Sequence, residues 1–504
     1  MLTTTEPPPD EICVGGIWRR GGGAVLSPYD PATGERITTV TGADTTDVDE
    51  AAAAAEHAAA DPRWRGLLPH ERARVLHRIA DAVEREAATL AALQTRDTGK
   101  TLTETAALVA SAVGTFRYTA AALETSDDAL TTPRGPHLTM TVQEPYGVVG
   151  AITPWNSPIA SDAQKLAPAL AAGNAVLLKP AAWTPLVALA LGRIVTQVLD
   201  AAGLPPGLLS VLPGDGRTVG DAVVRDPRVG MVSFTGGTDT GRGIAAIAAQ
   251  KLMPVSLELG GKSPTIVFPD ADLEHTVAGV LYGIFSSSGQ SCVAGSRVFV
   301  AREIYDEVLD ALDSATRALR VGPGTDPRTQ VAPLVHHRHR DAVAAMVEQA
   351  RADGARVVCG GRVPNDPDLA GGAYYLPTIL DGLGPDAAIC RQEVFGPVAV
   401  VLPFDGEDDL VAQANSTVYG LAAGIWTADH RRAWRVARRV LAGTVWINTY
   451  KQFSIATPFG GMGESGLGTE KGRPGIRTYS RTRSVFWGMA EEPLAWAGWS
   501  GGGR

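Results

Sequence analysis

Apolar residues recur at the spacing of a helix through the first quarter of the chain. Five of them lie three or four positions apart: Leu76, Ile79, Val83, Ala87 and Leu90. This repeat predicts amphipathic helices between about 46 and 124. The alanine-rich run 51–60 predicts a packed helix, because alanine has the highest helix propensity, and we expect Thr46 or Asp47 to cap it.

From residue 147 onward, short apolar runs alternate with segments of helical pattern. The runs that we expect to form buried strands are 148–152, 175–178, 208–212, 231–234 and 255–257. Strands that alternate with helices predict a parallel sheet covered on both faces. A second series of this kind is expected from about 263 to 450, so the predicted fold class is α/β.

Residues 126–146 interrupt this order. The segment 131–136 contains turn-forming Pro and Gly, and 138–142 has the pattern of a short strand. We therefore expect an extended hairpin outside the main core. The Trp- and Gly-rich end of the chain, 496–504, is expected to be a flexible tail.

Composition narrows the class of protein. The chain has 504 residues, of which 45% are apolar and 20% charged, and this excludes a disordered chain, a collagen and a coiled-coil rod. The formal net charge of −9 disfavours a nucleic-acid partner, which would require a basic chain. No apolar run reaches about 18 residues and no signal peptide precedes the first motif, so no membrane partner is expected. Four widely spaced cysteines do not form a disulfide framework, which favours a cytoplasmic location.

Cys292 is the candidate nucleophile, because small and polar residues surround it on both sides. A cysteine on a glycine-flanked turn near a helix N-terminus is expected to have a lowered pKa and to react as a thiolate. The alternative is that Cys292 is a small buried apolar residue. Cys13, Cys359 and Cys390 lack such a setting, and we interpret them as structural.

Glu258 and Asn156 are candidates for a general base and an oxyanion donor. Glu258 follows an apolar run and precedes a Gly-Gly turn, where partial burial would tune its pKa. Its alternative roles are pairing with Lys262 and capping a helix. Asn156 lies in a segment bounded by two prolines, so its amide is held rigidly and can donate to an oxyanion. Alternatively, this amide bonds its own backbone in a turn.

Two glycine-rich turns are candidates for binding a pyrophosphate. The segments 214–220 and 234–241 each follow a predicted strand, where backbone N–H groups can bind phosphate. Neither matches the GxGxxG fingerprint, and tight turns alone would also explain them. His336, His337 and His339 lack the spacing of zinc ligands and are interleaved with arginine, so we expect a solvated helix start and no metal site.

Seven motifs, taken together and in this order, resemble the NAD(P)-dependent aldehyde dehydrogenase superfamily. They are Pro154-Trp155-Asn156, Lys179-Pro180, Phe234-Thr235-Gly236, Glu258-Leu259-Gly260-Gly261-Lys262, Gly289-Gln290-Ser291-Cys292, Glu393-Val394-Phe395-Gly396-Pro397 and Pro458-Phe459-Gly460-Gly461. The resemblance extends from about residue 15 to 485. It implies a Rossmann-like cofactor domain, a catalytic α/β domain and an oligomerisation element that makes a homodimer or homotetramer. The implied boundaries are 1–125 and 146–257, then 258–470, and lastly 126–145 with 471–495.

The resemblance also implies the roles of the site residues. Cys292 would attack the aldehyde carbon, Asn156 and the Cys292 backbone N–H would stabilise the oxyanion, and Glu258 would activate the water that hydrolyses the thioester. Lys165 and Glu464 would support these groups. Lys179 would bind the adenine-side ribose and Glu393 the nicotinamide-side ribose. The other implied cofactor contacts are Ile152, Thr153, Pro154, Trp155, Ala182, Gly214, Phe234, Thr235, Gly236, Gly237, Gly241, Leu259 and Phe395.

Departures from the family pattern affect the cofactor and the substrate. Ala182 stands where NAD-preferring members often carry a Glu, so we expect NAD or NADP, with NADP tolerated and a preference for it open. The channel positions that are aromatic or bulky in common members are here Ser157, Ser161, Gln164 and Ser286. Phe453 and Phe459 would remain as aromatic walls, with Ser291 and Val293 beside the cysteine. Lys451 would attract a carboxylate unless it points into solvent, so a bulky or polar, anionic aldehyde is predicted.

Two other functions fit the same fold. A CoA-acylating aldehyde dehydrogenase typically lacks the general base, so Glu258 argues against it. A non-enzymatic binding protein would have no need to keep Cys292, Glu258 and Asn156 together. Oxidation of an aldehyde to a carboxylic acid is therefore the predicted function.

Overall fold

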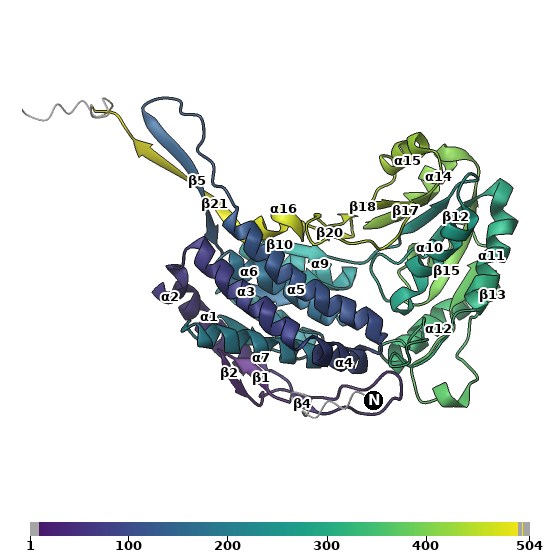
Figure 1. Cartoon of the computed structure of the whole chain (residues 1–504), viewed down its shortest axis with the longest axis horizontal. Helices are drawn as coiled ribbons and strands as arrows, with labels where there is room; N and C mark the ends of the chain where they lie inside the picture. Colours follow the sequence, from purple (N-terminus) through teal and green to yellow (C-terminus); the bar gives the residue numbers. More distant parts are fainter. Residues whose placement is uncertain (1–9, 492–495, 497–504) are drawn as a thin grey trace, which may run out of the picture.

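A computed structural model describes residues 10–491 and 496 of the chain (Figure 1). Two extended sheets organise it. The first sheet has the strand order β2-β1-β8-β7-β6-β9-β10-β20, in which β8, β7, β6, β9 and β10 run parallel. Its strands are β1 (Ile12–Val14), β2 (Ile17–Arg19), β6 (Val148–Ile152), β7 (Ala175–Lys179), β8 (Leu209–Val211), β9 (Val229–Thr235), β10 (Val255–Glu258) and β20 (Gly466–Leu467).

Helices cover the first sheet because their alanine-, leucine- and valine-rich faces are buried against it. They are α1 (Thr45–Ala60), α2 (Pro62–Arg65), α3 (Pro69–Arg85), α4 (Ala87–Thr98), α5 (Leu102–Glu124), α6 (Pro158–Ala171), α7 (Leu186–Ala201), α8 (Asp221–Arg225) and α9 (Thr238–Lys251). Of the described helices, α5 is the one long and apolar enough to cross a membrane. It packs against α3, α4 and α6 within the helical layer, with Val109 and Phe116 fully buried.

The second sheet has the order β13-β14-β15-β12-β11-β17-β18 and is parallel except for β13. Its strands are β11 (Pro264–Val267), β12 (Arg297–Ala301), β13 (Arg356–Cys359), β14 (Thr378–Asp381), β15 (Val398–Phe404), β17 (Ala422–Trp426) and β18 (Thr444–Ile447). Its helices are α10 (Leu273–Phe285), α11 (Tyr305–Arg317), α12 (His337–Ala352), α13 (Ala388–Arg391), α14 (Gly406–Ala414) and α15 (His430–Ala437). Phe299 belongs to one apolar core and its neighbours Val298 and Val300 to another, as expected for a strand buried on both faces.

Two long strands form an arm that projects from the body (Figure 1). β5 (His137–Pro145) pairs antiparallel with β21 (Ser480–Gly488) over their whole lengths. The remaining elements are short: β3 (Val25–Leu26), β4 (Val40–Thr41), β16 (Tyr419–Gly420), β19 (Met462–Gly463) and α16 (Gly472–Arg477). The tail predicted at 496–504 lies outside the described residues except for Trp496.

The structure corrects two local predictions. Asp44, not Thr46 or Asp47, caps α1: its side chain accepts from the backbone of both residues, and Asp47 completes a capping box. The apolar repeat that continues to Leu90 is divided between α3 and α4, because the backbone leaves the helical conformation at Glu86.

Candidate active site

The predicted site residues meet where the two sheets face each other end to end. Asn156 follows β6, Lys179 ends β7 and Glu258 ends β10, so all three lie at the carboxyl edge of the first sheet. Cys292 precedes β12 and Glu393 precedes β15, at the amino edge of the second sheet. Parallel α/β sheets commonly bind ligands at their carboxyl edge, and the second sheet adds a nucleophile from the opposite side.

The loop that carries Cys292 begins with three residues in the left-handed region. Ser287, Ser288 and Gly289 have φ values of 56°, 55° and 71°. A β-carbon at Gly289 would lie 2.0 Å from the carbonyl oxygen of Gly396, so only glycine fits there. Glu104, from the first turn of α5, holds this loop by accepting from the backbone N–H of Ser287 at 2.6 Å.

The Cys292 thiol is half-buried and is not at a helix N-terminus, because the segment that follows it is a turn leading into β12. Burial, with the nearby carboxylates Glu393 and Glu258, raises the pKa of Cys292 to about 12, while Lys471 and Lys451 act to lower it. The prediction of a lowered pKa is therefore wrong for the chain alone. The thiol must lose its proton to a base when it reacts.

Asn156 points to the same loop. Its Nδ2 donates to the backbone carbonyl of Gln290 at 3.0 Å. One N–H of this amide remains for another acceptor, and the backbone N–H of Cys292 makes no hydrogen bond with any described residue. These two N–H groups are the donors that we predicted for an oxyanion, and both are available for another acceptor.

The Glu258 carboxylate is buried, and neither of its oxygens has a hydrogen-bond partner among the described residues. Burial raises the pKa of Glu258 well above its ordinary value, and the charge of Glu470 raises it further, whereas Lys165 and Lys471 lower it. A buried carboxylate with a raised pKa is a stronger base than an ordinary one, as a general base requires.

A second buried carboxylate, Glu470, was missed from the sequence. Lys165 Nζ lies 2.5 Å from its Oε1, and Ser233 Oγ bridges the two at 2.8 and 3.1 Å. Tyr479 donates to the same Ser233 oxygen at 3.0 Å. The adjacent opposite charges of Glu470 and Lys471, within a glycine-rich segment, were the signal available in the sequence.

Glu464, which we expected in this supporting role, lies elsewhere. It pairs with Arg242 of α9 and is substantially exposed. Lys165 lies near enough to Glu258 for its charge to lower the pKa of that residue, and it pairs with Glu470 and not with Glu464.

Two of the predicted cofactor residues are buried ionisable side chains at the facing edges of the two sheets. Lys179 has a buried side chain, yet its ammonium makes no hydrogen bond or ion pair with any described residue, and burial lowers its pKa to about 8. Glu393 accepts from the Gly261 N–H at 3.1 Å, and a β-carbon at Gly260 would lie 2.4 Å from the Glu393 carboxylate. Burial raises the pKa of Glu393 to about 7.

The N-terminus of α9 adds a position for an anion. Its N-cap is Gly237, which supplies no side-chain cap, and nothing lies within 4 Å of the place where a β-carbon would be. The first N–H groups of this 14-residue helix are thus available to a pyrophosphate. Together with the Lys179 ammonium, which has no described partner, these N–H groups fit the anionic part of a dinucleotide.

The other predicted cofactor residues form two groups. Most lie at or just after the end of a strand, and two are buried residues that pack against glycines. Ile152 ends β6, and Thr153, Pro154 and Trp155 follow it; Thr235 ends β9, and Gly236 and Gly237 follow it; Ala182 follows β7; and Gly214 follows β8. Phe234 and Leu259 are buried and pack on glycines: β-carbons at Gly236 and Gly241 would lie 2.5 and 2.4 Å from their side chains.

Two histidines belong to a cluster of aromatic rings around Trp155. Its ring lies 5.1 Å from Phe395 and 5.2 Å from His339, and His336 stacks on Trp183 at 5.4 Å. His339 also bonds the carbonyl of Phe395 at 2.8 Å, and burial lowers its pKa. The predicted helix start is present at α12. His336 and His339 nevertheless pack against the rings of this cluster, so the expectation that they are solvated is wrong.

The predicted channel residues are mostly polar and partly bonded to each other. Ser157 lies 3.3 Å from Ser161, and Gln164 donates to the Glu470 carboxylate. Lys451 donates to Ser286 Oγ at 2.9 Å, so it does not simply point into solvent. Phe453 and Phe459 lie 5.9 Å apart. Ser291 is half-buried, whereas Val293 is 1% exposed behind Cys292 and presents no surface to a channel.

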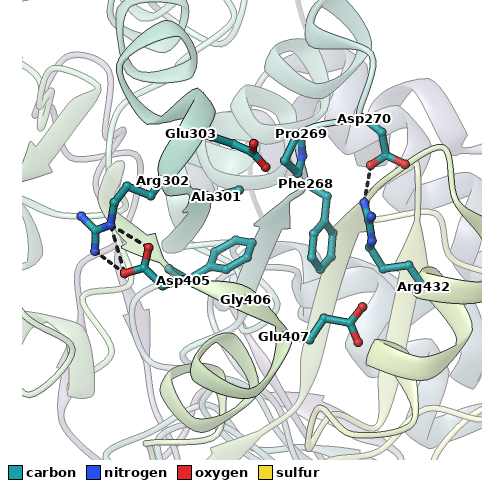
Figure 2. A pocket seen from close by; sticks show the side chains of 11 residues that line it. Phe268, Pro269, Asp270, Ala301, Arg302, Glu303, Asp405, Gly406, Glu407 and Arg432 are labelled. Atoms are coloured by element: carbon teal, nitrogen blue, oxygen red, sulfur yellow. Dashed lines mark hydrogen bonds and ion pairs between the residues drawn. The ribbon is translucent and has the colours of Figure 1, made fainter.

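A separate hollow of about 590 Å³ lies at the opposite edge of the second sheet (Figure 2). It is lined by residues that follow β11, β12 and β15, including Phe268, Arg302 and Asp405. Its arginines are already paired, Arg302 with Asp405 at 2.7 Å and Arg432 with Asp270 at 2.8 Å. None of the predicted site residues lines it, so the reacting groups belong to the space between the sheets.

Comparison with known proteins gives the class of this protein. The profile of the aldehyde dehydrogenase family matches residues 18–485. The chain belongs to the aldehyde dehydrogenase family, which confirms the predicted fold class and the predicted oxidation of an aldehyde.

Among individual relatives, a betaine aldehyde dehydrogenase of Cereibacter sphaeroides is 42% identical over 468 residues, covering 93% of this chain and 94% of its own. The NAD⁺ complex of an aldehyde dehydrogenase from Bacillus cereus superposes with a TM-score of 0.92 at 36% identity, covering 96% and 97% of the two chains. A betaine aldehyde dehydrogenase variant from Staphylococcus aureus, also in complex with NAD⁺, has a TM-score of 0.94 at 33% identity, covering 97% and 99%.

Proposed function

We propose that this chain oxidises a polar or acidic aldehyde to its carboxylic acid, with Cys292 as nucleophile, Asn156 as oxyanion donor and Glu258 as general base. One observation carries the proposal. The Asn156 amide bonds the backbone beside Cys292, whose own N–H is free, while the nearby Glu258 carboxylate is buried without a partner.

The chemistry of the chain follows from these positions. Cys292 Sγ forms a bond to the aldehyde carbon as its proton leaves for a base, and Glu258, with its raised pKa, is placed to accept it. Asn156 and the Cys292 N–H stabilise the oxyanion. A bound nicotinamide supplies the hydride acceptor. Glu258 passes this proton to solvent and then takes a proton from the water that attacks the resulting thioester. Collapse of the hydrolysis intermediate breaks the carbon–sulfur bond and releases the acid, and the leaving Cys292 sulfur takes up the proton held by Glu258, which restores the thiol and the carboxylate.

For the cofactor, we propose NAD with tolerance for NADP. Lys179 and Glu393 would bind its two riboses and the N-terminus of α9 its pyrophosphate. Ala182 supports the tolerance, because it puts no carboxylate near a 2′-phosphate. Installing the charge with Ala182→Glu should lower kcat/KM with NADP and leave kcat/KM with NAD within about threefold. An equal loss with both cofactors would contradict this reasoning.

For the substrate, the polar channel and Lys451 favour an acidic aldehyde. Burial and the charge of nearby Lys100 together lower the pKa of Lys451 to about 7. An incoming carboxylate would favour the charged form of this lysine. Replacement by Lys451→Ala should raise KM for an anionic aldehyde and leave KM for a neutral one unchanged. Unchanged KM for both would exclude the role of Lys451.

The alternative fate of the thioester is transfer to CoA. The buried and unpartnered Glu258 favours hydrolysis, because a CoA-acylating enzyme has no need to activate water. Product analysis with and without CoA separates the two, since hydrolysis yields free acid in both reactions.

We also propose that the chain forms a homodimer or homotetramer in the cytoplasm. The β5–β21 arm supports the assembly, since Leu130, Phe486 and Trp487 are each at least 63% exposed on or beside it. All four cysteines are free, which agrees with a reducing compartment. Light scattering of wild type and of Phe486→Ser with Trp487→Ser should show dissociation in the variant.

The experiment that tests the function is reduced-cofactor formation measured by absorbance. NAD and NADP are tested separately with aliphatic, aromatic, hydroxylated and carboxylate-bearing aldehydes. Cys292→Ala should abolish turnover while cofactor still quenches tryptophan fluorescence. Turnover that survives in Cys292→Ala would overturn the mechanism.

A further inference from the structure

Lys471 lies beside the predicted substrate channel, although it is not one of the predicted site residues. Its Nζ lies 4.5 Å from the ring centre of Phe453 and 5.2 Å from that of Phe459. These are the two aromatic walls predicted for the substrate channel. Lys471 also lines a small cavity together with Gln164, another predicted channel residue.

Backbone contacts fix the position of Lys471 on this wall. Phe459 and Glu470 exchange two backbone hydrogen bonds, of 2.8 and 2.7 Å, so the residue after Glu470 is held beside the Phe459 ring. The φ and ψ of Lys471 are 59° and 169°. This conformation is nearly restricted to glycine, and a lysine that adopts it stores strain of the kind that concentrates at functional sites.

The charge of Lys471 is not neutralised by an ion pair. No described carboxylate lies within ion-pair distance of its ammonium, whereas Lys165 is fully paired with Glu470. Lys471 acts on the reacting groups all the same, because its charge lowers the pKa of both Cys292 and Glu258. Lys471 is therefore a cation that is held against two ring faces and has no ion-pair partner among the described residues. Burial lowers the pKa of Lys471, and the nearby Glu470, Cys292 and Glu258 raise it.

Aromatic ring faces are what a protein uses to bind a quaternary ammonium, through cation–π attraction. In this chain the ammonium of Lys471 already occupies the faces of Phe453 and Phe459. A cationic aldehyde would lose its aromatic partners and meet a like charge. An aldehyde that carries a carboxylate would instead supply the missing counter-ion.

We propose that Lys471 is a specificity-determining residue that occupies the aromatic wall of the channel as an internal cation, excludes quaternary ammonium aldehydes and binds the carboxylate of an acidic aldehyde. The substrate part of this inference rests on the proposed function. The placement of the charge beside Cys292 does not depend on it.

The first test compares three aldehydes that differ in charge: betaine aldehyde, its neutral isostere 3,3-dimethylbutanal, and succinic semialdehyde. The wild-type enzyme should have the highest kcat/KM for the semialdehyde and the lowest for betaine aldehyde. In Lys471→Met, kcat/KM for the semialdehyde should fall at least about tenfold, because KM rises. In the same variant, kcat/KM for betaine aldehyde divided by kcat/KM for its isostere should rise at least about tenfold. Lys471→Arg should restore the wild-type order. Arg473→Gln, which removes an exposed charge from α16, is the matched control and should change neither ratio.

The second test needs no turnover. Cys292 is alkylated with iodoacetate, which is anionic, and with iodoacetamide, which is neutral, and the modified peptide is quantified by mass spectrometry. Lys471→Met should lower the ratio of the iodoacetate rate to the iodoacetamide rate about tenfold, and Arg473→Gln should leave this ratio unchanged. An unchanged ratio in Lys471→Met, or wild-type turnover of betaine aldehyde equal to that of its isostere, would overturn the proposal. Failure to oxidise any of the three aldehydes would contradict the proposed function. The ratio of the two alkylation rates would then test the role of Lys471 by itself.

Discussion

Replacing Glu470 by glutamine should move the acid limb of the pH–rate profile to lower pH. In the proposed mechanism Glu258 acts as a base, so the rate rises as the pH passes its pKa. Burial and the charge of Glu470 raise that pKa, and Lys165 and Lys471 lower it. Glu470→Gln removes the repulsion and leaves the Lys165 charge without its partner, and both changes favour ionised Glu258.

The magnitude follows from the electrostatics of a buried pair. Two unit charges roughly 6 Å apart interact by about 3 kcal/mol at an effective dielectric constant of about 20, which corresponds to about two pKa units. Because Lys165 and Lys471 already offset part of the repulsion, we expect a shift of about one unit. A buried ammonium that loses its carboxylate costs up to about 3–5 kcal/mol, so a lower melting temperature should accompany the shift.

The assay is kcat between pH 5 and 10 at constant ionic strength. A burst of reduced cofactor must be present, because it shows that thioester hydrolysis limits the rate. Ser233→Ala is the control: it removes the hydroxyl that bridges Lys165 and Glu470 but keeps both charges, so its limb should move little. A limb that stays in place or moves to higher pH in Glu470→Gln, with the burst retained, would refute the electrostatic argument.

Three further predictions concern the other parts of the site and its support. Asn156→Ala should lower kcat about 10²–10³-fold, as measured by cofactor reduction, while iodoacetamide still alkylates Cys292 at close to the wild-type rate. Glu104→Ala should lower kcat at least about tenfold because the Cys292 loop loses its anchor, whereas Glu104→Gln keeps an acceptor for it and should stay within about threefold; equal losses would exclude the anchoring role. Burial raises the pKa of Asp97 to about 8, so its contribution to stability is present at low pH and lost as the pH rises toward 8; in Asp97→Asn the melting temperature should therefore vary less between pH 5 and 8, as calorimetry would show.

Local patterns in the sequence were sufficient to predict much of the framework. The apolar run Val148–Ile152 is β6 with identical ends, and the run at 255–257 is β10 extended to include Glu258. Such strands are buried on both faces, so their continuous apolar character identifies them without tertiary information.

Features that depend on distant contacts could not be predicted in this way. Glu470 is more than 300 residues from Lys165, and nothing local in either segment specifies the pair. The direction of the Cys292 pKa shift also failed, because it depends on burial and on Glu393 and Glu258 and not on the turn that carries the thiol. Tertiary electrostatics overrode a reasonable local inference.

The end of the chain has a consequence for synthesis of the enzyme. β20 is the last strand of the first sheet and pairs with β10, directly beside Glu258, and Glu470 follows it within a few residues. A ribosome-bound chain that already contains Cys292, Asn156 and Glu258 therefore still lacks the strand that closes this edge. Until β20 has emerged, β10 presents an unpaired edge that can associate with other strands. Translation products that stop short of β20 should therefore be both inactive and prone to aggregation.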